Sequence, residues 1–386
     1  MRVIAAPDSF KGSLSGPLVA RAIARGVRRA CPDCIVNEIP IADGGEGTLE
    51  ALVQARQGEY RAYTVQGPLG QPVAAQLGLI ASGRIGVIEM AQASGLLLIT
   101  PEQRNPLLTS TFGTGELIRA ALDLGCQELI ITIGGSATVD GGLGMLAALG
   151  AKFYDNEHQE LAPVGASLAH LAQVDITGLD KRLQTCRITI ASDVTNPLCG
   201  PTGAAAVFGP QKGATPAMVA LLDQGLHNFA QATLTATGVD VLDLPGGGAA
   251  GGLGAALIAY AGGVMRSGID VVLDTIDIDT RLVGASLVFT GEGRMDGQSA
   301  QGKAPAGLAR RAQAHGCPVV ALVGSVGENY EAVFEQGITG VFPVLSAPTD
   351  LASAMEHAAD SVADTAYRVM HFYLGVTAVA GASPRQ

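Results

Sequence analysis

Five glycine-rich loops in this 386-residue chain carry the side chains that could do chemistry. The first, residues 7–13, joins an expected strand to an expected helix and contains Asp8, Ser9 and Lys11. The N-terminus of a helix attracts anions, and Lys11 adds a positive charge. Open parallel sheets bind ligands at the carboxyl ends of their strands. We therefore predict an anion site in this loop rather than a solvated turn.

The second loop, residues 41–48, and the fourth loop, residues 191–197, offer carboxylates. Residues 41–48 contain Asp43 and Glu46, which could hold Mg²⁺ or accept a hydroxyl proton, although paired carboxylates in such a turn also cap helices. Residues 191–197 contain Asp193, which could orient a hydroxyl nucleophile and contact a metal, or form an Asx turn before a proline. The residues alone leave these alternatives open.

The third loop, residues 133–142, follows an expected buried strand and is a candidate phosphate site. Its glycines surround Ser136 and a threonine. Backbone N–H groups exposed at glycines, together with hydroxyl groups, can cradle a phosphate, whereas a tight glycine turn is the structural alternative. The residues predicted to contact phosphate are Gly134, Gly135, Ser136, Gly141 and Gly142.

The fifth loop, residues 290–304, contains Arg294 and Lys303, two cations in a chain that has few. This favours an anion site. Residues 297–304 nearly match the P-loop pattern G-x-x-x-x-G-K-[ST], but Ala304 has no hydroxyl for Mg²⁺. The match therefore indicates either a phosphate loop of another lineage or an accident of composition.

Composition excludes several classes of protein. Apolar residues make up 48% of the chain and charged residues 15%, which excludes disorder, and the 52 glycines have no three-residue period, which excludes collagen. A net charge of −11 disfavours nucleic-acid binding. We see no signal peptide, and the uncharged stretch 245–265 is too rich in glycine for a membrane span. We expect a cytoplasmic protein with no membrane association.

The elements that would position these loops alternate between strand and helix at both ends of the chain. The first residues read as a strand (2–6), a helix (17–30) and a strand (35–41), which predicts a parallel sheet covered by helices. The same alternation returns after residue 287. Between about residues 60 and 100, short β-rich runs broken by glycine and proline predict hairpins.

We therefore predict an α/β protein with two domains. Residues 1–64 and 284–386 would form a discontinuous, Rossmann-like parallel-sheet domain, and residues 65–283 an inserted mixed α/β domain.

Cys31 and Cys34 form a C-x-x-C pair, but a redox pair normally opens a helix, and this pair follows one. We interpret both as ordinary cysteines in a reducing cytosol.

Together the loop sequences resemble the bacterial type-1 glycerate kinase family, from residue 1 to about residue 372. They are PDSFKG at 7–12, ADGGEGT at 42–48, GGSATVDGG at 134–142, SDVTNP at 192–197 and TGEGRMDGQS at 290–299. The resemblance implies two α/β domains with the active site in the cleft between them. It also implies a kinase that uses ATP and Mg²⁺ to phosphorylate D-glycerate, mostly on the C2 hydroxyl to give 2-phosphoglycerate. The same reaction giving 3-phosphoglycerate is the alternative.

This resemblance suggests a role for each loop, because phosphoryl transfer needs aligned reactants, cations on the phosphates and an acceptor for the hydroxyl proton. Arg294 is the expected clamp for the glycerate carboxylate, because its planar fork can bind two oxygens. Asp193 is the expected base. Lys303, Asp8 and Ser9 are expected to bind the substrate, and Lys11 and Asp296 to take part in catalysis. Asp43 and Asp193 are expected to bind Mg²⁺. Residues 134–136 and 141–142 are expected to bind the ATP phosphates. Asp43 and Asp296 are alternatives for the base.

Two other classes remain as rivals. A small-acid binding module would close two α/β domains on its ligand, and a nicotinamide-dependent oxidoreductase would need a dinucleotide fingerprint. Residues 246–251 match that fingerprint, but a run so rich in glycine matches it by chance. The six histidines show no metal-ligand spacing. We expect small-molecule partners and a monomer or homodimer.

Overall fold

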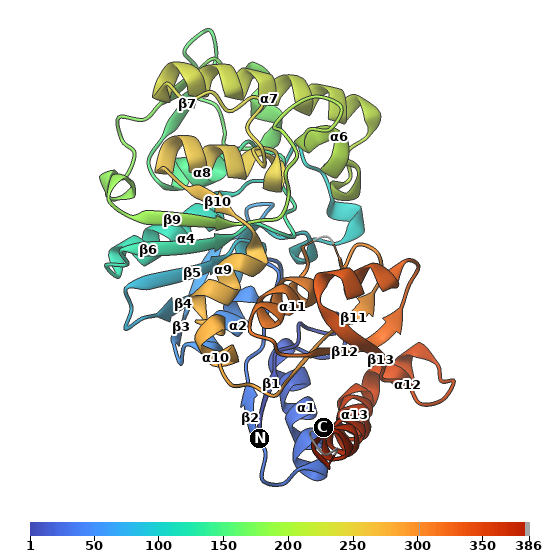
Figure 1. Ribbon diagram of the computed structural model, residues 1–386. Coiled ribbons are helices and arrows are strands. Elements are labelled where there is room, and N and C mark those ends of the chain that lie inside the picture. Colours follow the sequence, from blue (N-terminus) through green and yellow to red (C-terminus); the bar gives the residue numbers. More distant parts are fainter. Residues whose placement is uncertain (301, 383–386) are drawn as a thin grey trace. The chain divides into compact units, whose positions relative to one another are not determined.

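The computed structural model describes residues 1–300 and 302–382 and divides the chain into two compact units (Figure 1). Unit 1 comprises Met1–Asp43 and Ile269–Gln386, and unit 2 comprises Gly44–Gly268. Both chain ends therefore belong to one α/β unit, in agreement with the predicted fold class. The divisions after residues 43 and 268 differ from the boundaries expected near 64 and 284, because the segment after Gly44 packs on the sheet of unit 2.

Unit 1 is built on a five-stranded sheet in which every pairing is parallel. In spatial order its strands are β13 (Ile338–Pro343), β12 (Val319–Val326), β11 (Leu287–Met295), β1 (Arg2–Ala5) and β2 (Ile35–Glu38). The chain passes from β1 to β2 on one side, whereas β11 lies on the other side of β1. The strand order therefore reverses between β1 and β11, and such a switch point leaves a crevice at the carboxyl ends of the strands.

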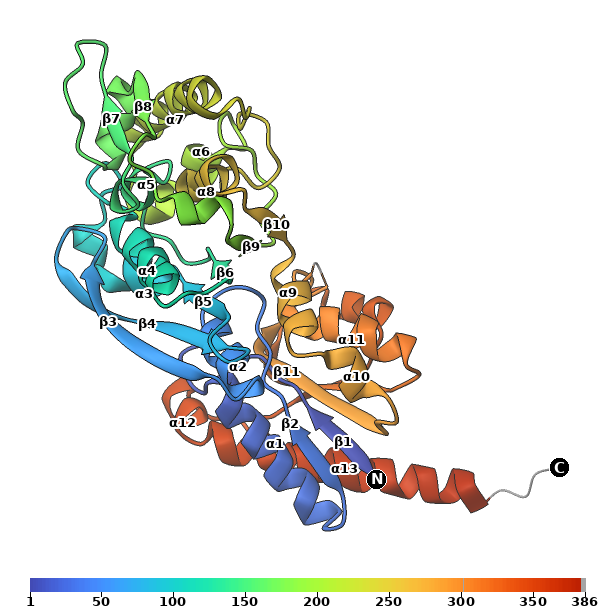
Figure 2. The same ribbon diagram turned by 90° about the vertical axis from the view of Figure 1, so that its left-hand side faces the viewer.

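Helices cover the sheet of unit 1. They are α1 (Gly16–Ala30), α9 (Gly268–Thr275), α10 (Ile278–Leu282), α11 (Ala304–Ala314), α12 (Leu351–Glu356) and α13 (Ala358–Ala382). Val19, Ile23 and Val27 form the buried face of α1, as their four-residue spacing predicts. A Cβ added at Gly26 would lie 2.1 Å from the carbonyl oxygen of Ala363, so this glycine lets α1 pack directly on α13 (Figure 2).

Unit 2 contains a mixed six-stranded sheet. In spatial order its strands are β10 (Val264–Arg266), β9 (Arg187–Ala191), β6 (Glu128–Thr132), β5 (Ile85–Glu89), β4 (Pro72–Ile80) and β3 (Glu59–Gln66). Strands β10, β9, β6 and β5 are parallel, whereas β5, β4 and β3 form an antiparallel meander, which confirms the predicted hairpins. Figure 2 shows the long curved ribbon of β3 and β4. A separate antiparallel pair joins β7 (Lys152–Tyr154) to β8 (Gln173–Asp175).

Six helices of unit 2 pack around one large apolar core that includes Phe153, Phe229 and Leu253. They are α3 (Ala91–Ser94), α4 (Phe112–Asp123), α5 (Leu143–Ala148), α6 (Ala204–Phe208), α7 (Pro216–Thr237) and α8 (Leu253–Ala261), whereas α2 (Thr48–Ala55) packs on β4 and β5. The uncharged stretch 245–265 is divided between a turn, α8 and the start of β10. Within the described ranges, none of the helices has the length and hydropathy needed to cross a membrane.

Two local features differ from the predictions. Strand β11 continues to Met295, so much of the fifth loop is strand; its pairing with β12 extends to Met295 and Val326. Cys31 and Cys34 form a disulfide, which corrects the prediction of ordinary free thiols.

Candidate active site

A pocket of about 340 Å³ lies in unit 1 at the carboxyl ends of its central strands. We call it the unit 1 pocket; its lining residues are Asp8, Ser9, Lys11, Asp43, Glu292, Gly293, Arg294, Asp296 and Lys303. The first loop follows β1, Asp43 follows β2, and Glu292 to Arg294 lie on β11. The pocket therefore occupies the switch point between β1 and β11, where α/β sheets bind ligands. It contains all the predicted site residues of unit 1.

Asp8 is held rigidly at this edge. Its N–H donates to the carbonyl oxygen of Gly291 at 2.9 Å, and its Oδ1 accepts the N–H of Ser9 at 2.6 Å. Burial raises the pKa of Asp8 to about 7, and the nearby negative charges of Asp43 and Glu292 contribute to this rise. A carboxyl group poised in this way can exchange a proton near neutral pH or become fully charged beside a bound cation.

Glu292 is a pocket residue that has no predicted role from the sequence. Its side chain is buried, and its Oε2 lies 3.6 Å from Nζ of Lys303. Its Oε1 is buried with no hydrogen-bond partner, and burial raises the pKa of this carboxyl group. Carboxylate oxygens are ligands that Mg²⁺ prefers, so the chemistry of these donors suits the cation, but among the described residues Asp8, Asp43 and Glu292 do not lie close enough together to form a ligand group.

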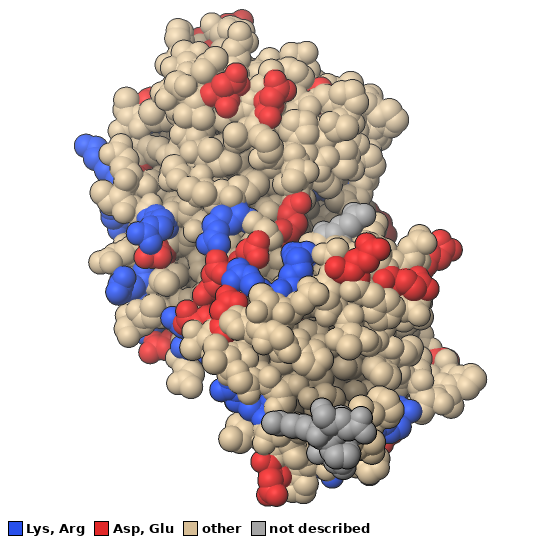
Figure 3. Space-filling view, in the orientation of Figure 1, with Lys and Arg blue, Asp and Glu red and all other residues tan. Residues whose placement is uncertain are grey.

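The cations of the pocket are accompanied by carboxylates. Arg294 is largely exposed, with Nε 3.6 Å from Oδ2 of Asp296, and Lys303 immediately precedes α11. Lys11 and these two cations share the pocket with four carboxylates. The predicted anion site therefore also contains carboxylates and has mixed charge. Charged side chains are also sparse and of mixed sign over the face shown in Figure 3.

The second, third and fourth loops come together in unit 2, also at the carboxyl edge of parallel strands. A Cβ added at Gly134 would lie 3.3 Å from Cα of Gly45, and one at Gly44 would lie 2.8 Å from Cα of Gly268. Oδ1 of Asp193 accepts the N–H of Gly268 at 3.0 Å, which fixes the carboxylate after β9. The division between the units falls inside the second loop, between Asp43 and Gly44.

The predicted phosphate loop separates into two parts. Gly134 and Gly135 reach the surface, and Gly135 has a φ of +75°, which few other residues adopt. Gly141 and Gly142 are buried, and a Cβ at Gly142 would lie 2.5 Å from Cβ of Ala256. A Cβ at Gly141 would lie 3.2 Å from the side chains of Leu168 and Phe229. Close packing in the interior therefore explains this second pair, and only the first pair is placed to meet a ligand from solvent.

Glu89 is a second carboxylate that the sequence alone does not reveal. It ends β5, is buried, and its Oε2 accepts the N–H groups of Gly47 and Leu49 at 3.2 and 3.3 Å. Burial raises its pKa to about 7. It anchors the start of α2 from a neighbouring strand. Nothing in the local sequence around Glu89 signals this contact, because the partner lies about forty residues away in the chain.

Lys212 is the third residue that was not predicted. It is 2% exposed, and its ammonium group contacts the third loop. It is the only lysine or arginine between Arg187 and Arg266, and this isolation is the sequence signal that could have identified it.

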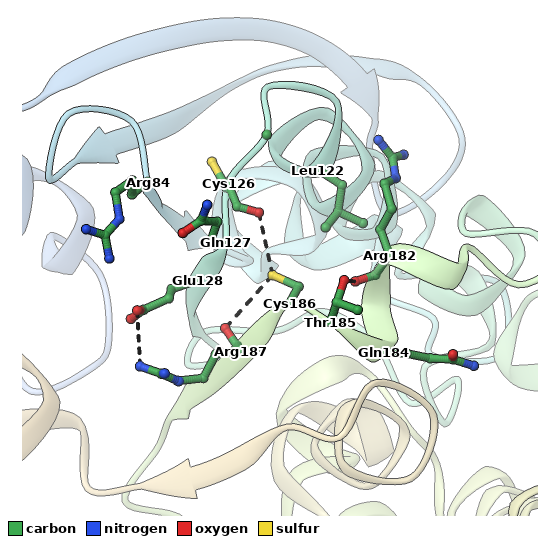
Figure 4. Close-up of a pocket in the computed structure, with 11 residues that line it drawn as sticks. Arg84, Leu122, Cys126, Gln127, Glu128, Arg182, Gln184, Thr185, Cys186 and Arg187 are labelled. Carbon is green, nitrogen blue, oxygen red and sulfur yellow. Dashed lines mark hydrogen bonds and ion pairs between the residues drawn. The ribbon is translucent and has the colours of Figure 1, made fainter.

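Another hollow, of about 760 Å³, lies in unit 2 at the opposite edge of the sheet, where β6 and β9 begin (Figure 4). Arg84, Arg182 and Arg187 line it. Arg187 lies 3.1 Å from Glu128, which lines the same hollow, and Arg182 pairs with Asp180 and Asp123. Two of its three guanidinium groups are therefore already paired with carboxylates.

Among residues 1–300 and 302–382, one group of side chains has metal-ligand spacing: Cys199, Asp223 and His227. Nδ1 of His227 is hydrogen-bonded to the carbonyl oxygen of Asp223 at 2.9 Å, which leaves Nε2 as the ring nitrogen able to bind a metal. Burial raises the pKa of the Cys199 thiol to about 12, and this opposes metal binding through the thiolate. The predicted Mg²⁺ ligands Asp43 and Asp193 belong to different units and are not part of this group.

Comparison with known proteins gives concordant matches. The family model described as "Glycerate kinase family" matches residues 3–374. The chain is 48% identical over 366 residues to a glycerate kinase of Bacillus subtilis (strain 168), covering 95% of this chain and 96% of the relative. It is 48% identical over 362 residues to a glycerate 2-kinase of Escherichia coli (strain K12), covering 94% and 95%. A crystal structure described as putative glycerate kinase 2 from Salmonella typhimurium LT2 has a TM-score of 0.89 at 48% identity, covering 98% and 99%.

The fold and its charged and glycine-rich loops define an α/β phosphotransferase. The structural neighbour shares this architecture over nearly the whole of both chains. The chain belongs to the glycerate kinase family, as the five loop sequences predict.

Proposed function

We propose that this protein transfers the γ-phosphoryl group of ATP to the C2 hydroxyl of D-glycerate and releases 2-phosphoglycerate and ADP. The observation that carries the proposal is the near-full-length identity of 48% to the relative named glycerate 2-kinase. The unit 1 pocket supports it, because its size and its paired cations and carboxylates suit a small hydroxy acid. Because cells supply ATP internally, we also propose that the enzyme works in the cytoplasm.

In this proposal, glycerate binds in the unit 1 pocket. Arg294 clamps the carboxylate, with Lys303 as a second cation. Asp8 and Ser9, at the end of β1, would bind the hydroxyl groups, because a buried carboxyl and a neighbouring hydroxyl can each donate or accept a hydrogen bond. Lys11 would neutralise charge on the transferring phosphoryl group.

The ATP phosphates bind the first part of the third loop, at Gly134, Gly135 and Ser136. When bound with ATP, Mg²⁺ supplies positive charge that offsets the charge on the phosphates. Asp43 and Asp193 remain the proposed Mg²⁺ ligands, and Glu292 is added because its Oε1 lacks a partner.

Asp193 is the proposed acceptor of the substrate hydroxyl proton. Its Oδ1 accepts the N–H of Gly268 at 3.0 Å, and a carboxylate held in one orientation in this way is suited to act as a general base. Asp296 would orient Arg294, since the two side chains lie 3.6 Å apart.

The direct test measures ADP release by the purified protein with ATP, Mg²⁺ and D-glycerate. We expect ADP release that depends on D-glycerate, with little ATP hydrolysis in its absence. A protein that binds glycerate but never consumes ATP would instead be a small-acid binding module and would contradict the proposal. L-Glycerate at the same concentration is the matched control for recognition of the hydroxyl.

A further inference from the structure

Lys212 occupies an unusual position, because a lysine is rarely fully buried. It ends a short 3₁₀ turn, Pro210–Lys212, just before α7, and its side chain enters the interior of unit 2. Its Nζ donates to Oγ of Ser136 and to the carbonyl oxygen of Thr138, both at 2.7 Å. A side chain from one segment thus holds the third loop at two points on either side of Ala137.

The interior around Lys212 does not require an ammonium group for packing. Burial lowers the pKa of Lys212 to about 7, and the nearby charge of Asp140 opposes this shift. Asp140 is satisfied by other donors, namely the N–H and hydroxyl of Thr111 and the N–H groups of Gly142 and Gly144. Burying the ammonium group has a desolvation cost, and the two hydrogen bonds to the third loop are what offsets it.

The contact with Ser136 indicates what this lysine does. Because Oγ of Ser136 accepts a hydrogen bond from Nζ of Lys212, its own hydroxyl proton remains for donation elsewhere. Ser136 directly follows Gly135, which is exposed. A hydroxyl that accepts a hydrogen bond is also a better donor to an anionic oxygen, because hydrogen bonds in a chain polarise one another.

We infer that Lys212 is a positioning residue for ATP: it acts through Ser136 and fixes residues 134–138 in the conformation that binds the phosphate groups. This inference rests on the proposed function, in which the same loop binds ATP. It assigns to Lys212 no direct contact with either substrate, because its side chain is enclosed.

The test is a double-mutant cycle with Lys212→Met and Ser136→Ala, and with Lys152→Met as the matched control. Lys152 is an exposed lysine of the same unit, paired with Glu160 at 3.2 Å, and its loss should leave the kinetics unchanged. We expect Lys212→Met and Ser136→Ala each to raise KM for ATP about tenfold or more, with KM for D-glycerate changed less than about twofold. The double variant should be no worse than the poorer single variant, because the two residues act as one unit.

Three results would overturn the inference. They are an ATP KM close to that of wild type in folded Lys212→Met, equal effects on both substrates, and single effects that multiply in the double variant. If far-UV circular dichroism shows that Lys212→Met does not fold, Ser136→Ala alone tests the inference, and an unchanged KM for ATP in that variant contradicts it.

Wild-type protein without glycerate-dependent ADP release would contradict the proposed function instead. ATP titration by calorimetry then tests Lys212 separately, with weakened binding expected in both single variants and unchanged binding contradicting the inference.

Discussion

Glu292 and Lys303 face one another in the unit 1 pocket, with Oε2 of the glutamate 3.6 Å from Nζ of the lysine, while Oε1 of the glutamate is buried without a partner. Leaving a buried carboxylate oxygen unpaired is costly, and a bound cation would remove that cost. The proposed function assigns this place to Mg²⁺ accompanying the substrates.

Glu292→Gln should therefore raise the Mg²⁺ concentration needed for half-maximal activity by about tenfold, because an amide is a weaker ligand than a carboxylate. The measurement is ADP release against Mg²⁺ at saturating ATP and D-glycerate. Glu335→Gln, at an exposed position of the same unit, is the matched control. A Glu292→Gln enzyme with the wild-type Mg²⁺ dependence would remove this residue from the cation site.

Arg294→Ala should raise KM for D-glycerate about 10- to 100-fold and leave KM for ATP nearly unchanged, because a charged, two-oxygen contact to the carboxylate is lost. Steady-state kinetics with each substrate varied in turn measures the difference. Arg310→Ala removes an exposed arginine on α11 and serves as control. If only the KM for ATP rises, Arg294 contacts the nucleotide and the clamp is misassigned.

Asp193→Asn should lower kcat by about 10²- to 10⁴-fold and weaken ATP binding far less, because the amide keeps the contact with Gly268 but cannot accept the hydroxyl proton. Turnover and calorimetric ATP binding are measured on the same preparation. Asp240→Asn is a control at an exposed position in the same unit. Near wild-type turnover in Asp193→Asn would exclude Asp193 as the base.

Asp8 should make the protein less stable as the pH rises. Its pKa is about 7 in the folded protein, whereas the ordinary pKa of an aspartate is 3.8, so the folded state holds a proton that the unfolded state releases between these values. The free energy of unfolding contributed by this group therefore falls from about pH 4 to about pH 7 and stays low above it.

Asp8→Asn removes this dependence. We expect the variant to be more stable than wild type at about pH 8 by roughly 1–4 kcal/mol, with the difference shrinking toward about pH 4. Urea unfolding followed by circular dichroism across this range is the measurement, with exposed Asp33→Asn as control. A constant difference between Asp8→Asn and wild type at every pH would show that Asp8 is not a buried titrating group.

The loops could be predicted as ligand sites because of the residue types they contain. Glycine, aspartate and lysine at a strand end have few structural reasons to occur together, and Lys11, Arg294 and Lys303 do line one pocket. The parallel sheet followed from the strand–helix–strand pattern at the N-terminus. The β-rich runs after residue 60 likewise indicated the meander of β3, β4 and β5.

The features that were missed depend on tertiary contacts. The division after Asp43 follows from the packing of α2 on β4 and β5, which no local pattern encodes. Gly141 and Gly142 look like phosphate-loop glycines, but close packing in the interior of unit 2 explains them. Lys212 and Glu89 acquire their importance only from partners far away in the chain.

Phosphorus-31 NMR of the product formed from ATP, Mg²⁺ and D-glycerate tests the central proposal most directly. The proposed function predicts the resonances of ADP and of a phosphate monoester whose phosphorus couples to the single proton on C2 of glycerate. A phosphorus coupled to the two protons on C3 would identify 3-phosphoglycerate and contradict the assigned acceptor, and the absence of any new phosphate ester would contradict the kinase activity itself.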